Sequence, residues 1–178
     1  MRVHVEWGAK ALEQATGTAI IVDCLSFSTA LSVACARSAK VFPFGTYEGG
    51  KRLAACLSIE CVVNRKEQGL SLSPPTLAIV AAGERWHGDG SLRPAFEDQL
   101  AAGAIASFLI GDKTSEAIAA MAVFNACEND LLAALHQCDS GKELTERGFA
   151  QDVEWASQLN AAKCVPRLQT LQKTYEDI

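Results

Sequence analysis

The stretch Thr18-Ala19-Ile20-Ile21-Val22-Asp23-Cys24-Leu25-Ser26-Phe27-Ser28-Thr29 decides the expected fold of this chain. Its first five residues form a continuous apolar run, which is typical of a strand buried on both faces of a parallel sheet. Asp23 ends the run, and apolar residues then recur at roughly helical spacing as far as Ala34. A strand, an acid, a turn and a helix in this order indicate the carboxyl edge of a parallel sheet, where open α/β folds bind their ligands.

The turn after Asp23 is rich in hydroxyl groups. Ser26, Ser28 and Thr29 lie at the expected start of the helix, where free backbone N–H groups and the helix dipole favour an anion. A purely structural interpretation is equally open from the residues alone, with Asp23 ending a strand and the hydroxyls capping a helix.

Length and charge limit the classes of protein to consider. The chain has 178 residues, 49% of them hydrophobic, which predicts a single domain over 1–178 with a substantial core. A net charge of −5 and the lack of a basic stripe argue against nucleic acid as a partner. No apolar run reaches the roughly 18 residues that cross a membrane, and residues 1–6 resemble a strand more than a signal peptide. We therefore expect a cytoplasmic protein with no membrane partner.

The cysteines and the common motifs exclude further classes. Seven cysteines are scattered without any C-x-x-C pair, so reduced core residues are expected and a structural zinc site is not. The sequence has no P-loop, no G-x-G-x-x-G and no G-x-S-x-G, which disfavours the usual nucleotide-binding enzymes and serine hydrolases.

Strands and helices alternate along the chain. This order predicts an α/β fold, a three-layer α/β/α sandwich with a mostly parallel or mixed sheet. We expect strands at 2–7 (an edge strand), 18–22, 40–44, 59–63, 78–82 and 163–168, and helices at 47–57, 94–110, 114–137 and 150–159.

Several acids fall near expected junctions of loops and helices: Asp23, Glu84, Glu97, Asp98 and Asp152. Carboxylate oxygens suit Mg²⁺, which takes one or two of them and completes its shell with water and phosphate. The helix dipole alone also favours an acid in a first turn, and this simpler interpretation applies to three of the five.

Two further motifs have a polar or cationic side chain in a position that suits an anion. Arg85 lies in a glycine-rich loop after the strand at 78–82, and its guanidinium has the geometry to grip a phosphate. Ser140 begins Ser-Gly-Lys-Glu, which matches a capping box and therefore also predicts a helix start without any ligand.

The order of these pieces resembles the 2-phosphosulfolactate phosphatase (ComB-like) family. The resemblance is carried by Val22-Asp23-Cys24-Leu25-Ser26-Phe27-Ser28-Thr29, Leu70-Ser71-Leu72-Ser73-Pro74-Pro75, Ala82-Gly83-Glu84-Arg85, Glu97-Asp98-Gln99-Leu100-Ala101-Ala102-Gly103-Ala104, Ser140-Gly141-Lys142-Glu143-Leu144, Gln151-Asp152-Val153 and Cys164-Val165-Pro166.

The resemblance implies a Mg²⁺-dependent phosphatase that hydrolyses a small acidic phosphomonoester to the free hydroxy acid and phosphate. It implies metal ligands at Asp23 and Glu97 and catalytic roles for these two residues and Asp98. Whether Asp23 forms an aspartyl-phosphate or serves a metal-activated water stays open. The substrate-binding residues implied are Ser26, Ser28, Thr29, Ser73, Arg85 and Ser140.

Two departures from the family pattern keep an alternative open. Ser26 stands where family members often have arginine, and a strand–helix–strand passage is lacking between Leu77 and Ala78. The resemblance therefore implies additional residues at that junction, and the alternative is a non-catalytic α/β ligand-binding protein with the phosphatase fold. A homodimer is the default expectation for so apolar a domain.

Overall fold

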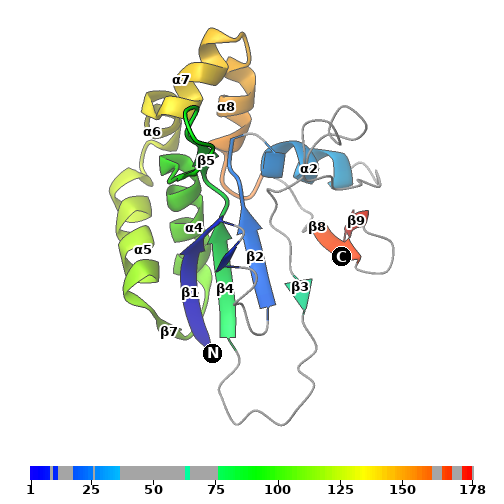
Figure 1. Cartoon of the computed structure of the whole chain (residues 1–178), viewed down its shortest axis with the longest axis vertical. Helices are drawn as coiled ribbons and strands as arrows, with labels where there is room; N and C mark the ends of the chain where they lie inside the picture. The colour runs from blue at the N-terminus through cyan, green and yellow to red at the C-terminus, as the bar shows by residue number, and fades with distance from the viewer. Residues whose placement is uncertain are drawn as a thin grey trace.

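The computed structural model describes residues 1–8, 10–11, 18–25, 27–36, 63–64, 76–161, 166–169 and 174–177. A five-stranded sheet with strand order β3-β2-β4-β1-β7 lies at its centre (Figure 1). Its strands are β1 (Arg2–Trp7), β2 (Thr18–Val22), β3 (Val63–Asn64), β4 (Thr76–Ala81) and β7 (Asp112–Lys113). β4 pairs in parallel with β1 and β2, β7 pairs in parallel with β1, and β3 pairs antiparallel with β2. The predicted α/β class and mostly parallel sheet are confirmed.

The prediction of an edge strand at 2–7 is wrong, because β1 lies between β4 and β7. Its alternating pattern has a different cause: Val3 and Val5 are buried against the helices, whereas Glu6 is exposed. β4, with four successive buried residues at its end, is the middle strand of the sheet.

β4 also runs through the junction between Leu77 and Ala78. These two residues pair with Val3 and His4 of β1 in continuous parallel register. The inference that the intact polypeptide has additional residues at this junction stays a prediction.

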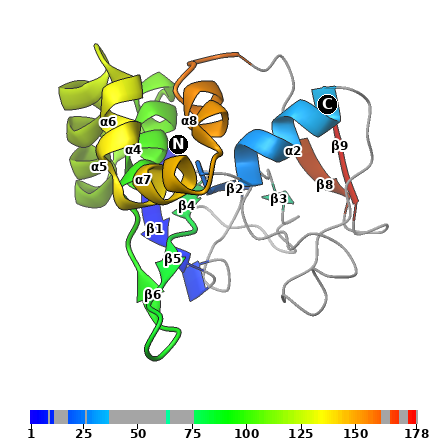
Figure 2. The ribbon, with the colours of Figure 1, turned by 90° about the horizontal axis from the view of Figure 1, so that it is seen from above.

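Two antiparallel helices, α4 (Phe96–Phe108) and α5 (Ser115–Cys127), lie against one face of the sheet (Figure 2). They approach closely at Gly103, where a Cβ atom would overlap the carbonyl oxygen of Ala120. The core between helices and sheet consists of Val3, Val5, Ile20, Val22, Ile79, Ala102, Ala106, Ala117 and Ala120. Among the described elements these helices form one layer on the sheet, and the second layer of the expected sandwich stays a prediction.

Beyond β2, away from α4 and α5, lies α2 (Phe27–Ala36) (Figures 1 and 2). It contacts the separate antiparallel hairpin formed by β8 (Pro166–Gln169) and β9 (Thr174–Asp177). β8 falls within the expected last strand, whose first residues lie outside the described part of the chain, and β9 is a partner strand that was not expected.

The single long helix predicted at 114–137 is wrong. The structure has α5 and then α6 (Leu131–Gln137), and a bend of 109° separates them. The polar turn before Leu131 causes the break, because the Asp130 side chain accepts a hydrogen bond from Ala133 N at 3.0 Å and starts a new helix. In the described part of the chain, no single helix has the length and hydrophobicity to cross a membrane, and α5 with α6 passes that test only as this bent pair.

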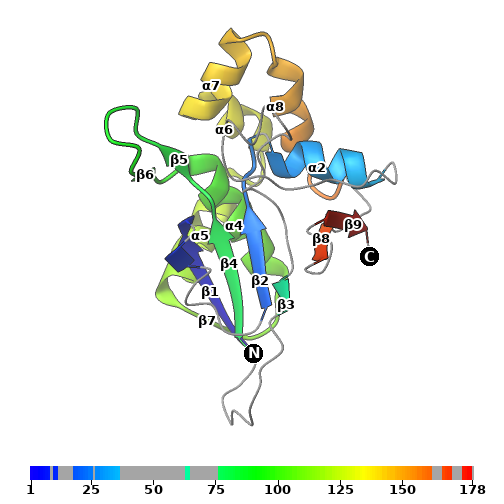
Figure 3. The same cartoon turned by 45° about the vertical axis from the view of Figure 1, so that its right-hand side comes forward.

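Three short helices gather above the carboxyl ends of β2 and β4: α6, α7 (Asp139–Glu146) and α8 (Ala150–Ala156) (Figures 1 and 3). A hairpin of β5 (Glu84–Arg85) and β6 (Leu92–Arg93) extends from the end of β4 (Figure 3). The glycine-rich loop of the sequence is the tip of this hairpin and is exposed to solvent. The predicted elements at 40–44 and 47–57 and most of 59–63 lie outside the described residues.

Candidate active site

The candidate site is built around Asp98, in the first turn of α4. Its Oδ1 accepts a hydrogen bond from Cys24 N at 2.7 Å, and its Oδ2 accepts one from Gly83 N at 2.8 Å. Cys24 follows β2 and Gly83 follows β4, so one carboxyl group joins the backbone beyond two neighbouring strands. Asp98 is 3% exposed, and both of its oxygens are engaged.

The backbone at Gly83 is shaped for this contact. Its φ of +68° lies in the left-handed region that favours glycine, and a Cβ atom there would lie 2.9 Å from the carbonyl oxygen of Arg93. A larger residue would therefore push the hairpin away from the end of β4 and move the N–H group that Asp98 binds.

Four acids meet electrostatically at this edge of the sheet: Asp23, Glu84, Glu97 and Asp98, which we call the acidic cluster. Burial, followed by the negative charge of Asp23, raises the pKa of Asp98 to about 8 despite the two N–H bonds that favour its charged form. Burial and then the charge of Glu97 raise the pKa of Glu84. The negative charges of the acidic cluster thus repel one another, and a cation placed between these carboxyl groups would relieve that repulsion.

Glu97 is the most buried member of the cluster, at 2% exposure. Its negative charge acts on Cys138, whose pKa rises to about 12, chiefly because of burial and then because of that charge. The Cys138 thiol donates to Leu135 O at 3.0 Å. Cys138 in turn caps α7, since its sulfur accepts from Gly141 N at 3.3 Å. The start of α7 is therefore tied to the acidic cluster.

The hydroxyls after β2 hold the turn that carries Asp23. Ser28 Oγ accepts from Asp23 N at 3.0 Å, and Thr29 Oγ1 donates to Cys24 O at 3.0 Å. α2 begins at Phe27, so both hydroxyls lie in its first turn, as predicted. Their direct contact with a substrate stays a prediction.

The remaining predicted residues are dispersed. Ser26 and Ser73 lie outside the described residues. Arg85 is exposed on the hairpin, where its Nη1 donates to Gly90 O at 3.0 Å. The capping box predicted at Ser140 is wrong, because Cys138 is the cap and Ser140 is a buried residue inside α7.

Arg93 is a residue that the sequence reasoning missed. It pairs across the hairpin with Glu84, and its charge lowers the pKa of that acid. The turn residues Gly88-Asp89-Gly90 are the signal that predicts a hairpin here and hence this pairing.

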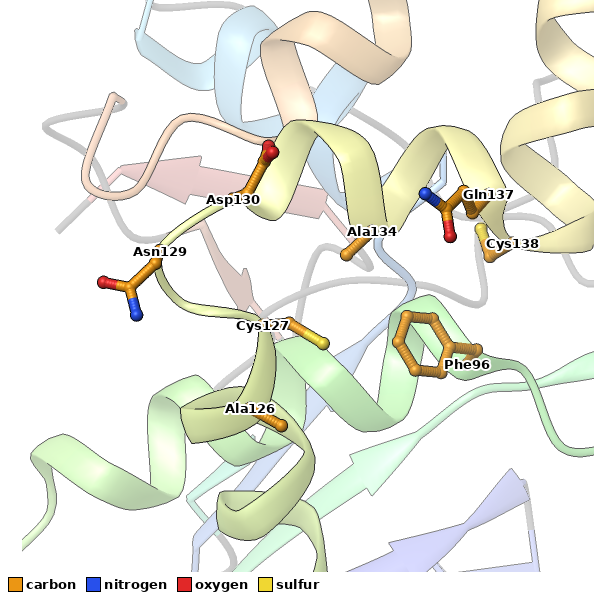
Figure 4. A pocket seen from close by; sticks show the side chains of 8 residues that line it. All are labelled: Phe96, Ala126, Cys127, Asn129, Asp130, Ala134, Gln137 and Cys138. Atoms are coloured by element: carbon orange, nitrogen blue, oxygen red, sulfur yellow. The ribbon is translucent and has the colours of Figure 1, made fainter.

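A cleft of about 470 Å³ lies beside the cluster (Figure 4). Phe96 and Cys138 form part of its wall. Phe96 directly precedes Glu97 in α4, and the charge of Glu97 acts on Cys138. The other lining residues come from the end of α5, from α6 and from the turn between them: Ala126, Cys127, Asn129, Asp130, Ala134 and Gln137.

In the described part of the chain, no group of three or more His, Cys, Asp or Glu side chains is arranged to hold a metal ion. This finding excludes a preformed cage there, but Mg²⁺ usually takes only one or two carboxylates from the protein. Asp23 and Glu97 both act electrostatically on Asp98, whose own oxygens are occupied, and their role as ligands of Mg²⁺ stays a prediction.

These features define an α/β protein with an acidic site at the carboxyl edge of a mostly parallel sheet. Residues 48–170 match the 2-phosphosulpholactate phosphatase family, and the chain belongs to that family. The family expected from the sequence is thus confirmed.

Two relatives show how far the similarity extends. A probable 2-phosphosulfolactate phosphatase of Gloeobacter violaceus is 34% identical over 92 residues, which cover 52% of this chain and 36% of the relative. A protein of the same description from Microcystis aeruginosa is 31% identical over 121 residues, or 64% of this chain and 46% of the relative. The chain therefore spans less than half the length of these relatives.

Proposed function

We propose that the chain acts as a Mg²⁺-dependent phosphatase on a small acidic phosphomonoester such as 2-phosphosulfolactate. The products would be inorganic phosphate and the free hydroxy acid. Membership of the family supports the reaction class. The observation that carries the assignment to this site is the pair of hydrogen bonds that Asp98 accepts from Cys24 N and Gly83 N, which we call the Asp98 clamp. The clamp gathers the acidic cluster at the edge of the sheet where α/β folds bind ligands.

In this proposal Asp23 and Glu97 hold the ion. When bound, Mg²⁺ neutralises the phosphoryl oxygens and lowers the pKa of a coordinated water molecule. Asp98 fixes the ends of β2 and β4, and Ser28 fixes the backbone N–H of Asp23. The deep burial of Glu97 keeps bulk water from one side of the site.

Asp23→Asn tests the proposal, because it removes one charge from the cluster while keeping the size of the side chain. We expect Mg²⁺-dependent release of phosphate from 2-phosphosulfolactate to fall by about a hundredfold or more, and calorimetry to show weaker binding of Mg²⁺. Asp112→Asn is the matched control, since Asp112 is an exposed acid in β7 at the amino end of the sheet.

Equal activity of Asp23→Asn and the wild type would contradict the proposal. Binding of Mg²⁺ and substrate without turnover by either protein would favour the alternative, a ligand-binding protein with the phosphatase fold. We also propose a cytoplasmic, homodimeric protein without nucleic-acid or membrane partners. The state of the described thiols supports a reducing location, since Cys24, Cys127 and Cys138 form no disulfide.

A further inference from the structure

We propose that Arg93, together with the start of α7, binds a second acid group of the substrate, a carboxylate or sulfonate next to the phosphoester. This inference rests on the proposed function and names the feature of the substrate that the site selects.

Arg93 lies next to the acidic cluster through the backbone. It pairs with Glu84 in the β5–β6 hairpin, and its carbonyl oxygen lies against Gly83. The N–H of Gly83 is one of the two groups that Asp98 binds. Arg93 is thus next to the Asp98 clamp, because its cross-strand partner Glu84 directly follows Gly83.

The guanidinium of Arg93 is oriented by two neighbours. Its Cζ lies 5.7 Å from the centroid of the Trp86 ring, and its Nη1 lies 3.5 Å from Asp139 Oδ2. The Arg93 side chain is 21% exposed, whereas that of Asp139 is 80% exposed. An ion pair with so exposed a partner is weak, so an entering anion can displace it. The face of the Trp86 ring meanwhile keeps the planar guanidinium of Arg93 in an orientation that can bind two oxygens of a ligand.

Asp139 is the first residue of α7, so Arg93 points to the start of a helix. The next residue, Ser140, is 6% exposed, and in the described part of the chain its hydroxyl makes no hydrogen bond. A buried hydroxyl without a partner suits a ligand oxygen, and the helix dipole favours a negative charge at this end. The charge of Glu97 acts on Cys138, the N-cap of α7, so this helix start lies near the acidic cluster.

Charge balance explains why such a subsite is needed. A phosphomonoester with a second acid group would be repelled by the negatively charged members of the acidic cluster, and a single divalent cation serves the phosphate. Arg93 supplies positive charge at the hairpin side of the cluster, as its effect on Glu84 shows. The second acid group is therefore expected to lie between Arg93 and Ser140.

The test compares two probes that differ only in this group: 2-phosphoglycolate, with a carboxylate, and ethyl phosphate, with a methyl in its place. Arg93→Met should lower kcat/KM for 2-phosphoglycolate by about a hundredfold, the loss of a charge-assisted pair of hydrogen bonds. For ethyl phosphate the change should stay within about threefold. Arg93→Lys keeps the charge without the fork and should give an intermediate value for 2-phosphoglycolate.

Arg147→Met is the control, because Arg147 only pairs with Glu143 on the exposed surface of α7. Equal losses for both probes, or a selective loss in Arg85→Met in place of Arg93→Met, would overturn the inference. Urea unfolding of each variant separates these effects from loss of the fold.

Calorimetry with both probes and Mg²⁺ keeps the two proposals distinct. If the wild type binds but hydrolyses neither probe, the proposed function fails. The inference on Arg93 then stands if Arg93→Met weakens binding of 2-phosphoglycolate alone. It is overturned if the wild type binds 2-phosphoglycolate no more tightly than ethyl phosphate.

Discussion

α4 and α8 begin alike in sequence and differ completely in what their first turns do. Each helix has acids in its first turn, and neither N-cap residue, Ala95 or Phe149, makes a side-chain capping bond. The acids of α4, Glu97 and Asp98, are 2% and 3% exposed. Asp152 of α8 is only half-buried and is not part of the acidic cluster.

The difference comes from what lies in front of each helix. α4 starts where β2 and β4 end, so its first turn faces backbone N–H groups that need partners. α8 packs on α6 and α7, whose backbone bonds are already made within the helices. The acid in the first turn of α8 thus interacts only with the helix dipole, whereas the acids in the first turn of α4 form the centre of the candidate site.

The largest effect we expect is on stability, from a matched pair of variants. Asp98→Ala leaves two N–H groups without partners and should lower the free energy of unfolding by about 3 kcal/mol. Asp152→Ala should lower it by less than about 1 kcal/mol, as loss of a dipole interaction does. Urea denaturation measures both, and similar losses in the two variants would remove the contrast between the helices.

The pH dependence of stability sharpens the same contrast. The pKa of Asp98 rises from an ordinary value of 3.8 to about 8 on folding, so the native state keeps a proton that the unfolded chain has released. Asp98 therefore makes the metal-free protein less stable as the pH rises from about 4 to about 8.

Asp98→Asn should remove this contribution to the slope, whereas Asp152→Asn should leave the slope unchanged. Thermal unfolding in the presence of a chelator, across this range of pH, gives both slopes. A slope in Asp98→Asn equal to that of the wild type would mean that the carboxyl group keeps an ordinary pKa.

The smallest effect concerns thiols on either side of the cleft. Cys138, buried beside the first turn of α4, has a pKa of about 12, whereas Cys127 at the end of α5 is partly exposed. At pH 8 Cys127 should react with a thiol reagent at least about tenfold faster than Cys138. Mapping of the modified peptides by mass spectrometry measures this, and the denatured protein should react at all seven cysteines.

Much of the fold was predictable, because apolar runs of strand length stand out in this sequence. β2, with the acid and helix that follow it, lies as expected from local pattern alone. The failures have two different causes, one distant in sequence and one local. β1 gains a neighbour in β7 from residues 112–113, and the break between α5 and α6 depends on the cap formed by Asp130.

The site was predictable in its acids but not in its arginine. Asp23, Glu97 and Asp98 are near one another, as expected, because the carboxyl ends of parallel strands share one edge. Arg85 was favoured because it lies in the glycine-rich loop after the strand at 78–82, yet in a hairpin the residue on the same side as Glu84 is the one across the ladder. That residue is Arg93, and its pairing with Glu84 depends on the turn Gly88-Asp89-Gly90 that lies between them.

The Asp98 clamp also constrains the order in which the protein can fold. Its bond to Cys24 closes a loop of 74 residues, and such long closures carry a high entropic cost that slows folding. The ends of β2 and β4 can be fixed only after α4 has been synthesised and docked on the sheet. A nascent chain released before Asp98 therefore has β2 and β4 but no assembled site, so this carboxyl group makes completion of the fold a condition for chemistry.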